Sequence, residues 1–456
     1  MRTLIAVAFL LAAAPAAAQL TGPERRIAAT VDAELPRDEA LLEKLVDQNS
    51  GSRNLAGVEA VGRMMRAELE PLGFQVRWIP MPEVARAGHL VAVHKGNGRG
   101  KRMLLIGHLD TVFEPDSPFQ RYVRKDTAHA EGPGASDDKG GLVVMVAALR
   151  AMQAAGTLRD ADITIVLTGD EEEAGRPIAI SRRDLVDAGR ATDVALDFEG
   201  LAQEGGRDMG SIARRSAGGW EVRATGRTGH SSGIFGGNAG YGAIYELVRI
   251  LDAFRRDLTE PNLTYNVGLI VGGATAELDS AHIRGEATGK TNIIPPVAIA
   301  RGDIRALSRD QDERVRARMR DIVARHLPGT GAEIAFDEPY PPMAPTAGGK
   351  ALLDRLNLVN RDLGLAEMGL LDPLKRGAGD ISFVAEFEDG LVGLGTASHG
   401  DHAPGETVDL STIPRQAKRA AILMTRLSGE KRDAARKEKA AKAAARGSLP
   451  DGTRRG

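Results

Sequence analysis

The sequence, 456 residues long, contains no cysteine. This absence excludes disulfide bonds, thiolate metal sites and a cysteine nucleophile together. Any bound metal must therefore be held by histidine, aspartate or glutamate, which suit a catalytic zinc ion better than a structural zinc finger.

Aromatic residues are also scarce, and the net charge is small. Aromatic side chains make up 4% of the chain, and the formal net charge at pH 7 is −2. A nearly neutral protein lacks the strong field that attracts nucleic acid or a membrane surface, so we expect neither as a partner. Apolar residues, at 42%, suffice for large cores, and the length predicts about two to three domains.

Long hydrophobic runs are missing as well. No segment after residue 18 reaches the roughly 18 consecutive apolar residues that indicate a membrane-spanning helix. Residues 1–18 combine a positive start at Arg2, a short apolar stretch and three final alanines, the pattern of a secretory signal peptide. We therefore predict a periplasmic or secreted protein. Residues 429–456 consist largely of Lys, Arg and Ala and are predicted to be a solvated tail.

Short apolar runs alternate with helical patterns along most of the chain, for example at 103–106, 142–149 and 163–167. This alternation predicts an α/β fold, a mixed sheet flanked by helices, with ligands bound at the carboxyl ends of strands. From about residue 208 the pattern predicts a small inserted α+β domain. The predicted segments are a signal peptide at 1–18, the larger domain at 19–208 and 319–428, the insert at 209–318, and the tail at 429–456.

Metal-binding residue types stand at the ends of the predicted strands or in the adjoining loops. They are His108, Asp110, Asp137, Glu171, Glu172, Asp197, Glu199, His399 and His402. Each alone would ordinarily be a solvated loop charge, but their shared position is hard to attribute to chance in a chain with nine histidines. Carboxylates that share a cleft repel one another, and a divalent cation relieves the repulsion. Two zinc ions that share a carboxylate and a water are a common hydrolytic arrangement.

Eight short motifs occur in order along the chain. They are Gly107-His-Leu-Asp-Thr, Gly134-Ala-Ser-Asp-Asp-Lys-Gly-Gly, Asp170-Glu-Glu, Phe198-Glu, Gly229-His, Thr291-Asn-Ile-Ile-Pro, Asp303-Ile-Arg and His402-Ala-Pro-Gly-Glu. As a set they resemble the zinc metallopeptidase family that contains glutamate carboxypeptidase (carboxypeptidase G type), acetylornithine deacetylase, succinyl-diaminopimelate desuccinylase and aminoacylase. The resemblance covers about residues 35–428.

The resemblance implies two zinc ions per subunit. Asp137 would bridge the two ions. His108 and Glu199 would complete one site, and Glu172 and His402 the other.

Two further carboxylates have implied roles in catalysis. Asp110 would orient His108. Glu171 would be the general base, which takes a proton from the attacking water and later passes it to the leaving nitrogen.

Three ligand choices have neighbours of the same type. Asp138 adjoins Asp137, and the resemblance places the ligand first in that pair. Asp197 could replace Glu199, because the two share a strand face. His402 is preferred to His399 because Glu406 follows it by four residues, as in the family pattern.

The insert would be the lid or dimerisation domain of that family, in a homodimer. His230 would reach the partner subunit's active site and stabilise the developing oxyanion. Asn292 and Arg305 would hold the substrate's terminal carboxylate, and Gly379 belongs to a glycine-rich substrate loop. Arg207, Arg214 and Arg215 precede the insert; if they face the cleft, they favour an acidic side chain.

Together these implications define a di-zinc metallopeptidase, a carboxypeptidase that cleaves an amide bond next to a free carboxylate. Its substrate would be a small peptide or N-acyl amino acid, and its product a C-terminal amino acid such as glutamate. An N-acyl amino acid deacylase or a dipeptidase would use the same metal site. A non-catalytic periplasmic zinc-binding module is the alternative of another class, and the intact Glu171 argues against it.

Overall fold

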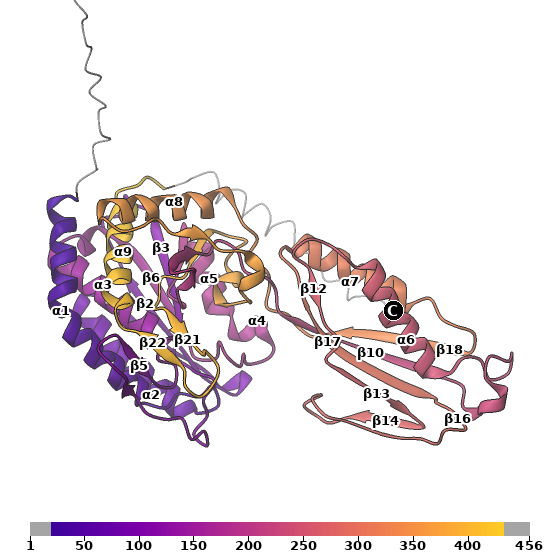
Figure 1. Ribbon diagram of the computed structural model, residues 1–456. Helices are drawn as coiled ribbons and strands as arrows, with labels where there is room; N and C mark the ends of the chain where they lie inside the picture. The colour runs from indigo at the N-terminus through magenta and orange to yellow at the C-terminus, as the bar shows by residue number, and fades with distance from the viewer. Residues whose placement is uncertain (1–19, 433–456) are drawn as a thin grey trace, which may run out of the picture.

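The computed structural model describes residues 20–432, which form two domains that lie side by side (Figure 1). The larger domain contains both ends of the described chain, and the smaller domain is built from its middle. The predicted signal peptide, at residues 1–18, and most of the predicted tail lie outside the described residues. Within residues 20–432, no helix has the length and apolar character needed to cross a membrane.

A six-stranded sheet forms the centre of the larger domain. Its strands follow the order β1 (Gln75–Met81), β2 (Arg86–His94), β6 (Asp162–Thr168), β3 (Arg102–His108), β7 (Val194–Asp197) and β20 (Asp389–Val392). The last four strands in this order are parallel, whereas β1 and β2 pair antiparallel. The predicted α/β class with a mixed sheet is confirmed, and the carboxyl ends of its parallel strands meet at one edge.

Helices cover both faces of this sheet. One face carries α1 (Gly22–Val46), α2 (Leu55–Leu69), α3 (Lys139–Ala155), α8 (Ala347–Asp362) and α9 (Thr412–Leu427), and the other carries α4 (Ile178–Ser181) and α5 (Arg183–Ala191). In β3, Met103 and Leu105 belong to the first core, and Leu104 and Ile106 to the second. Burial on both sides explains why this strand is an unbroken apolar run in the sequence.

Two smaller sheets complete the larger domain. One consists of β4 (Val123–Arg124), β5 (His129–Glu131), β22 (Thr407–Asp409) and β21 (Ser398–His399), and the other of β8 (Ala202–Glu204), β9 (Arg207–Gly210) and β19 (Gly369–Leu370). The first sheet holds the loop that contains His402 close to the glycine-rich loop before α3, because the Gly132 amide donates to the Glu406 carbonyl.

The small domain is an antiparallel sheet with helices on one face. Its strands are β10 (Gly218–Gly226), β12 (Thr264–Tyr265), β13 (Leu269–Gly273), β17 (Val297–Arg305) and β18 (Thr330–Phe336), and its helices are α6 (Gly242–Asp257) and α7 (Arg309–Val323). Two short ladders, β11 (Gly229–His230) with β16 (Ile293–Ile294) and β14 (Thr275–Leu278) with β15 (Gly285–Thr288), extend it. Trp220 packs edge-on against Phe254 in the core beneath the helices.

The limits predicted for the insert, 209–318, need correction at both ends. Residue 209 lies in β9, which pairs with β19 of the larger domain. Residue 318 lies inside α7, and β18 then pairs with β10 along its whole length. The small domain therefore runs from Gly218 to Phe336. In the structure Glu333 and Ala335 are exposed while Ile334 and Phe336 are half-buried, the alternation of an antiparallel strand with one solvated face.

Candidate metal centre and active site

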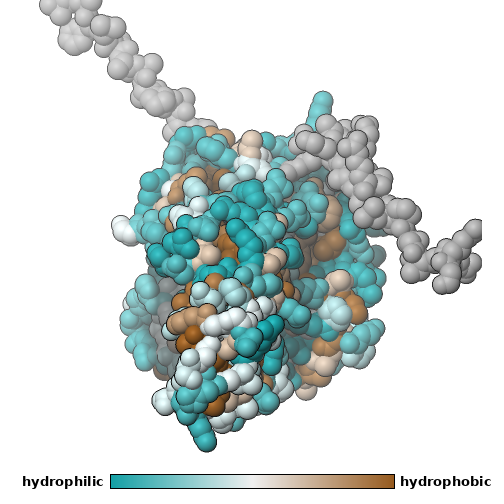
Figure 2. Space-filling view, turned by 90° about the vertical axis from the view of Figure 1, so that its right-hand side faces the viewer, coloured by the Kyte–Doolittle hydropathy of each residue, from teal (hydrophilic) through white to brown (hydrophobic). Residues whose placement is uncertain are grey.

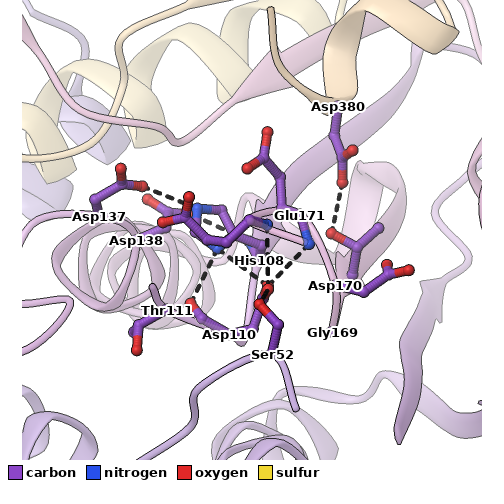
Figure 3. A network of polar contacts seen from close by, with 12 residues as sticks. Ser52, His108, Asp110, Thr111, Asp137, Asp138, Gly169, Asp170, Glu171 and Asp380 are labelled. Carbon is purple, nitrogen blue, oxygen red and sulfur yellow. Dashed lines mark hydrogen bonds and ion pairs between the residues drawn. The ribbon is translucent and has the colours of Figure 1, made fainter. Parts of the chain in front are cut away.

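His108 ends β3 with its imidazole fixed on both sides (Figure 3). Its Nδ1 lies 3.1 Å from the Asp110 carbonyl oxygen and its Nε2 lies 2.9 Å from Asp137 Oδ1. Burial opposes the charged imidazole, but the contacts with Asp110 and Asp137 outweigh burial and raise the pKa of His108 well above its usual value. An Nδ1–H that donates to Asp110 is the tautomer that leaves Nε2 available as a ligand.

The Asp110 carboxylate is fully buried and organises the two glutamates. It accepts hydrogen bonds from Ser52 Oγ at 2.5 Å and from the backbone amides of Glu171 and Glu172 at 3.0 and 3.1 Å. Asp110 therefore fixes the histidine of β3 and the acidic turn after β6 at the same time.

Asp137 lies between two imidazoles. Its Oδ2 is 2.9 Å from His402 Nε2, while its Oδ1 faces His108. Burial raises the pKa of Asp137, but these two histidines outweigh burial and hold the pKa below its usual value. Asp138 is also buried, but its Oδ2 accepts from the His108 backbone amide. Asp137, rather than Asp138, therefore lies between the two histidines.

Glu406 holds the loop that carries Asp137. Its carboxylate accepts hydrogen bonds from the backbone amides of Gly134, Ser136 and Asp137 at 3.0, 2.9 and 3.1 Å. Sequence reasoning used Glu406 only to choose between two histidines and assigned it no role. The four-residue spacing from His402 was the available signal.

Ligand atoms converge in two overlapping groups. His108, Asp137 and Glu172 form one, and His108, Glu171 and Glu199 form the other; within each group the ligand atoms all lie within 4.8 Å of one another. His402 adjoins the first group, with its Nε2 3.3 Å from Glu172 Oε2. The structure therefore brings the five predicted metal ligands together. Glu171, the predicted general base, lies beside them.

The two alternatives Asp197 and His399 lie outside these groups, which were found among the described residues. Asp197 Oδ1 accepts from the Glu199 backbone amide, and the exposed His399 pairs with Thr407 in a two-strand ladder. His402 has a φ of 64°, in the left-handed region that residues other than glycine seldom adopt. Such backbone conformations are concentrated at functional sites.

The donor set fits divalent metal ions. Burial and the negative charge of Asp137 raise the pKa of Glu172 to about 10, and burial and Glu199 raise that of Glu171 well above its usual value. Glu172 Oε1 is buried without a hydrogen-bond partner among the described residues. Carboxylates crowded in this way need positive charge, and oxygen and imidazole donors without thiolate are those of catalytic zinc sites.

Of the three arginines singled out in the sequence, Arg207, Arg214 and Arg215, it is Arg214 whose guanidinium reaches the group of ligand atoms. It is 4% exposed, its Nη1 lies 2.7 Å from Glu199 Oε2, and its Nε donates to the Gly377 carbonyl. A Cβ atom at position 379 would lie 2.2 Å from Arg214 Nη1, so Gly379 makes room for the guanidinium. Arg215 is buried against Thr264, and Arg207 is exposed and donates to the Glu367 carbonyl.

The predicted substrate residues are divided between the two ends of the small domain. His230 and Asn292 are exposed and adjacent, since the Ser231 amide donates to the Asn292 carbonyl. They lie by β16, at the end of the small domain remote from the larger one (Figure 1). Arg305 ends β17, and its Nη1 lies 3.3 Å from a Cβ placed on Gly377. In this structure, only Arg305 of the three is near the glycine-rich loop.

Tyr340 was missed by the sequence reasoning. Its hydroxyl donates to the Glu171 carbonyl at 3.0 Å and accepts from Arg182 at 2.6 Å. Arg182 is itself buried between Asp170 and Asp380. A single tyrosine in a proline-rich connection carries no periodic signal, so nothing in the sequence pointed to this contact.

Comparison with known proteins identifies the class. The pattern of Peptidase family M20/M25/M40 matches residues 104–426, so the chain belongs to this family and is a hydrolase. It is 28% identical to carboxypeptidase G2 of Pseudomonas sp. (strain RS-16), over 86% of this chain and 89% of that one. It is also 30% identical to a succinyl-diaminopimelate desuccinylase of Acidiphilium cryptum, over 59% and 68%.

The fold agrees with solved structures of the same family. A dinuclear metal-binding peptidase of the M20 family from Bacillus subtilis aligns with a TM-score of 0.60 at 16% sequence identity. The alignment covers 87% of this chain and 99% of that protein. The combination of a mixed α/β domain and a small α+β domain is therefore that of the family.

Proposed function

We propose that the protein is a di-zinc carboxypeptidase. It hydrolyses an amide bond next to a free carboxylate and releases a C-terminal amino acid, glutamate or one like it, from a small peptide or N-acyl amino acid. The observation that carries this proposal is the Asp137 carboxylate between His108 Nε2 and His402 Nε2, with Glu171 and Glu172 beside it.

Two zinc ions per subunit would be held by the five converging ligands. His108, Asp137 and Glu199 would hold one ion, and Asp137, Glu172 and His402 the other. Bound zinc supplies Lewis acidity, which polarises a carbonyl and acidifies water. The dinuclear metal-binding peptidase of similar fold supports this stoichiometry.

Glu171 is the proton carrier of the proposed reaction. Its backbone is fixed by Asp110 at the amide and by Tyr340 at the carbonyl, so its carboxylate is directed from a rigid turn. From there it takes a proton from the attacking water and returns it to the leaving nitrogen.

A preference for C-terminal amino acids has two supports. Carboxypeptidase G2 is similar over most of its length, and Arg305 stands near the glycine-rich loop with a guanidinium that suits a carboxylate. The desuccinylase relatives favour the second candidate, an N-acyl amino acid deacylase, and a dipeptidase is the third.

Hydrolysis of a substrate panel tests the reaction. The zinc-loaded enzyme is given N-acyl amino acids, dipeptides and folyl-glutamate compounds, with Glu171→Gln as the control for contaminating activity. We expect the highest kcat/KM for a substrate that ends in a free amino acid. Faster cleavage of N-acyl groups or dipeptides would select one of the alternatives, and no zinc-dependent cleavage would refute the proposal.

A homodimer would explain the position of His230. The histidine is too far along the small domain to serve its own site in this arrangement, whereas a partner subunit's site could receive it. Exposed apolar side chains support a contact surface on the small domain: Ile244, Tyr245 and Val248 of α6 and Ile270 of β13. Seen from the small-domain side, the molecule shows hydrophobic side chains among polar ones (Figure 2).

Mixed dimers test whether His230 acts across subunits. His230→Ala and Glu171→Gln chains are each expected to be inactive, but a mixed dimer would contain one complete site. Random mixing should therefore restore about a quarter of the wild-type rate. No restoration in verified mixed dimers would assign His230 to its own subunit or remove it from catalysis.

Export to the periplasm or medium is proposed from residues 1–18. Cell fractionation with antibody detection checks it, and the mature N-terminus should follow the alanines before Gln19. A full-length protein in the cytoplasm would contradict it.

A further inference from the structure

We infer that Arg376 is a substrate-binding residue that recognises a carboxylate in a pocket beside the metal centre. This inference rests on the proposed function for the reaction itself and adds the class of substrate, one that carries a second acidic group. The carboxylate could belong to the side chain of the released amino acid or to the acyl group.

The pocket has a volume of about 340 Å³ and lies next to two of the proposed ligands. It is lined by residues 200–204, by Leu371, Lys375 and Arg376, and by Ser398, His399 and Asp401. Gly200 directly follows Glu199, and Asp401 directly precedes His402. Roughly ten waters would fill such a volume, which is room for an acidic side chain or a short dicarboxylic acyl group.

Arg376 is half-buried and differs from most arginines near this site in its lack of an ion pair; among the described residues the buried Arg215 also lacks one, but it does not line this pocket. Arg182 and Arg214 each lie within 2.7 Å of a carboxylate oxygen, and Arg150 and Arg419 also pair with aspartates. Arg376 donates from Nη2 to the Gly200 carbonyl, and within residues 20–432 it forms no ion pair. Its Nε is buried and has no hydrogen-bond partner among the described residues.

A half-buried guanidinium without an ion-pair partner is costly, and a bound carboxylate lowers that cost. Burial, followed by repulsion from Arg214, lowers the pKa of Arg376, whereas Glu199, Asp137 and Asp401 oppose this shift only through space, without an ion-pair contact. A guanidinium remains protonated even so, and its fork of donors matches a carboxylate. Arg376 lines the pocket, so an acidic group bound there can complete the pairing.

The other charged residues of the pocket form no ion pair with Arg376 among the described residues. Lys375 pairs with Glu204 at 2.7 Å. Asp401 is exposed, so water screens its charge, and it is hydrogen-bonded to Ser398. In a peptide, an amide N–H accompanies the acidic group, and Asp401 provides an acceptor for it on the outer side of the pocket.

Isosteric substrate pairs test the assignment. One pair is N-acetyl-glutamate and N-acetyl-glutamine, and the other is N-succinyl-alanine and its succinamoyl counterpart. Wild-type enzyme is expected to prefer the acidic member of one pair, and Arg376→Gln to lower kcat/KM for that member by about 10–100-fold, as the loss of a charged hydrogen bond predicts. The neutral member should be unaffected, and Arg376→Lys should restore part of the preference.

The pair that responds identifies the source of the carboxylate. An equal loss for acidic and neutral substrates, or no loss for either, would overturn the inference. Arg361→Gln, which removes an exposed ion pair with Glu367, is the control for a general effect of losing an arginine.

A binding measurement separates this inference from the proposed reaction. Titration calorimetry of metal-free Glu171→Gln protein with glutamate and with succinate needs no turnover. Binding of one of them that is lost in the Glu171→Gln, Arg376→Gln double variant supports the pocket even if the substrate panel shows no hydrolysis. Equal binding by both proteins, or by neither, would reject it, provided that both unfold at the same temperature.

Discussion

The Arg214 guanidinium lies 2.7 Å from Glu199 Oε2, and the same side chain donates from Nε to the Gly377 carbonyl. One buried cation therefore connects a proposed zinc ligand to the glycine-rich loop. Arg214 also belongs to the segment that leads into the small domain, where its backbone pairs with Met343.

Arg214→Met is expected to weaken zinc binding by about 10–100-fold, because groups that orient metal ligands typically contribute that much. Competition with a chromogenic chelator measures the affinity. Arg207→Met is the matched control, since Arg207 is exposed and contacts only the Glu367 carbonyl among the described residues. An unchanged zinc affinity in Arg214→Met would show that zinc binding by Glu199 does not depend on its ion pair with Arg214.

The adjacent glutamates should give opposite results. Glu171→Gln should lower turnover by at least about 100-fold, the contribution of a general base, with zinc content near that of the wild type. Glu172→Gln should lose zinc together with activity. Metal analysis by mass spectrometry decides between them, and zinc loss in Glu171→Gln would make Glu171 a ligand.

Tyr340→Phe should reduce kcat by about tenfold and change KM little, because the variant loses the hydroxyl that holds the Glu171 backbone carbonyl. A stability loss of about 1–2 kcal/mol is also expected from the missing hydrogen bonds. Tyr265→Phe is the matched control, as the Tyr265 hydroxyl likewise donates to a backbone carbonyl, that of Phe254, in the small domain. Equal kcat values in the two variants would show that Tyr340 contributes to stability and not to catalysis.

Because of Asp208, the free energy of unfolding should decrease at acidic pH. Burial raises its pKa, but hydrogen bonds from Gln203 and Arg419 outweigh burial and hold the pKa below 3.8. For a carboxyl with a lowered folded-state pKa, the stabilisation is complete above the unfolded value and disappears as the pH falls through the folded value.

Asp208→Asn should therefore destabilise the protein by about 1–3 kcal/mol near pH 7 and by much less near pH 3. Urea unfolding at several pH values measures the difference. Asp252→Asn, which removes a carboxylate on an exposed face of α6, should change stability little. A destabilisation of Asp208→Asn that did not depend on pH would exclude the ionised carboxylate as its cause.

The metal cluster could be predicted from the sequence because its members follow buried strands. His108 ends β3 and Glu171 follows the end of β6, so the parallel register of these two strands brings them to one edge. The two-residue spacing from His108 supplied the supporting carboxylate Asp110, whereas the four-residue spacing from Glu406 served only to select His402. These relations are local or depend only on strands being parallel.

Other features depended on contacts that a sequence pattern does not encode. Tyr340 and Arg376 lie in irregular segments, so no periodicity marked them. The partner of Arg214 is Glu199 of the same chain, whereas the sequence offered an acidic substrate side chain as its partner if it faced the cleft. The limit at residue 318 was wrong because the rest of α7 and the half-buried β18 belong to the small domain. His230 and Asn292 are not assembled with the cluster, because they lie at the end of the small domain remote from the larger one.

The two segments that join the domains are hydrogen-bonded to each other, Ala217 to Tyr340 and Arg214 to Met343. The chain consequently leaves and re-enters the larger domain at one point. In topological terms, the small domain is the loop of a single long hairpin, and it adds no crossing to the path of the larger domain. Its surface can therefore diverge, lengthen or shorten during evolution without shifting the register of β7 or β20, which keeps one metal site available to many substrates.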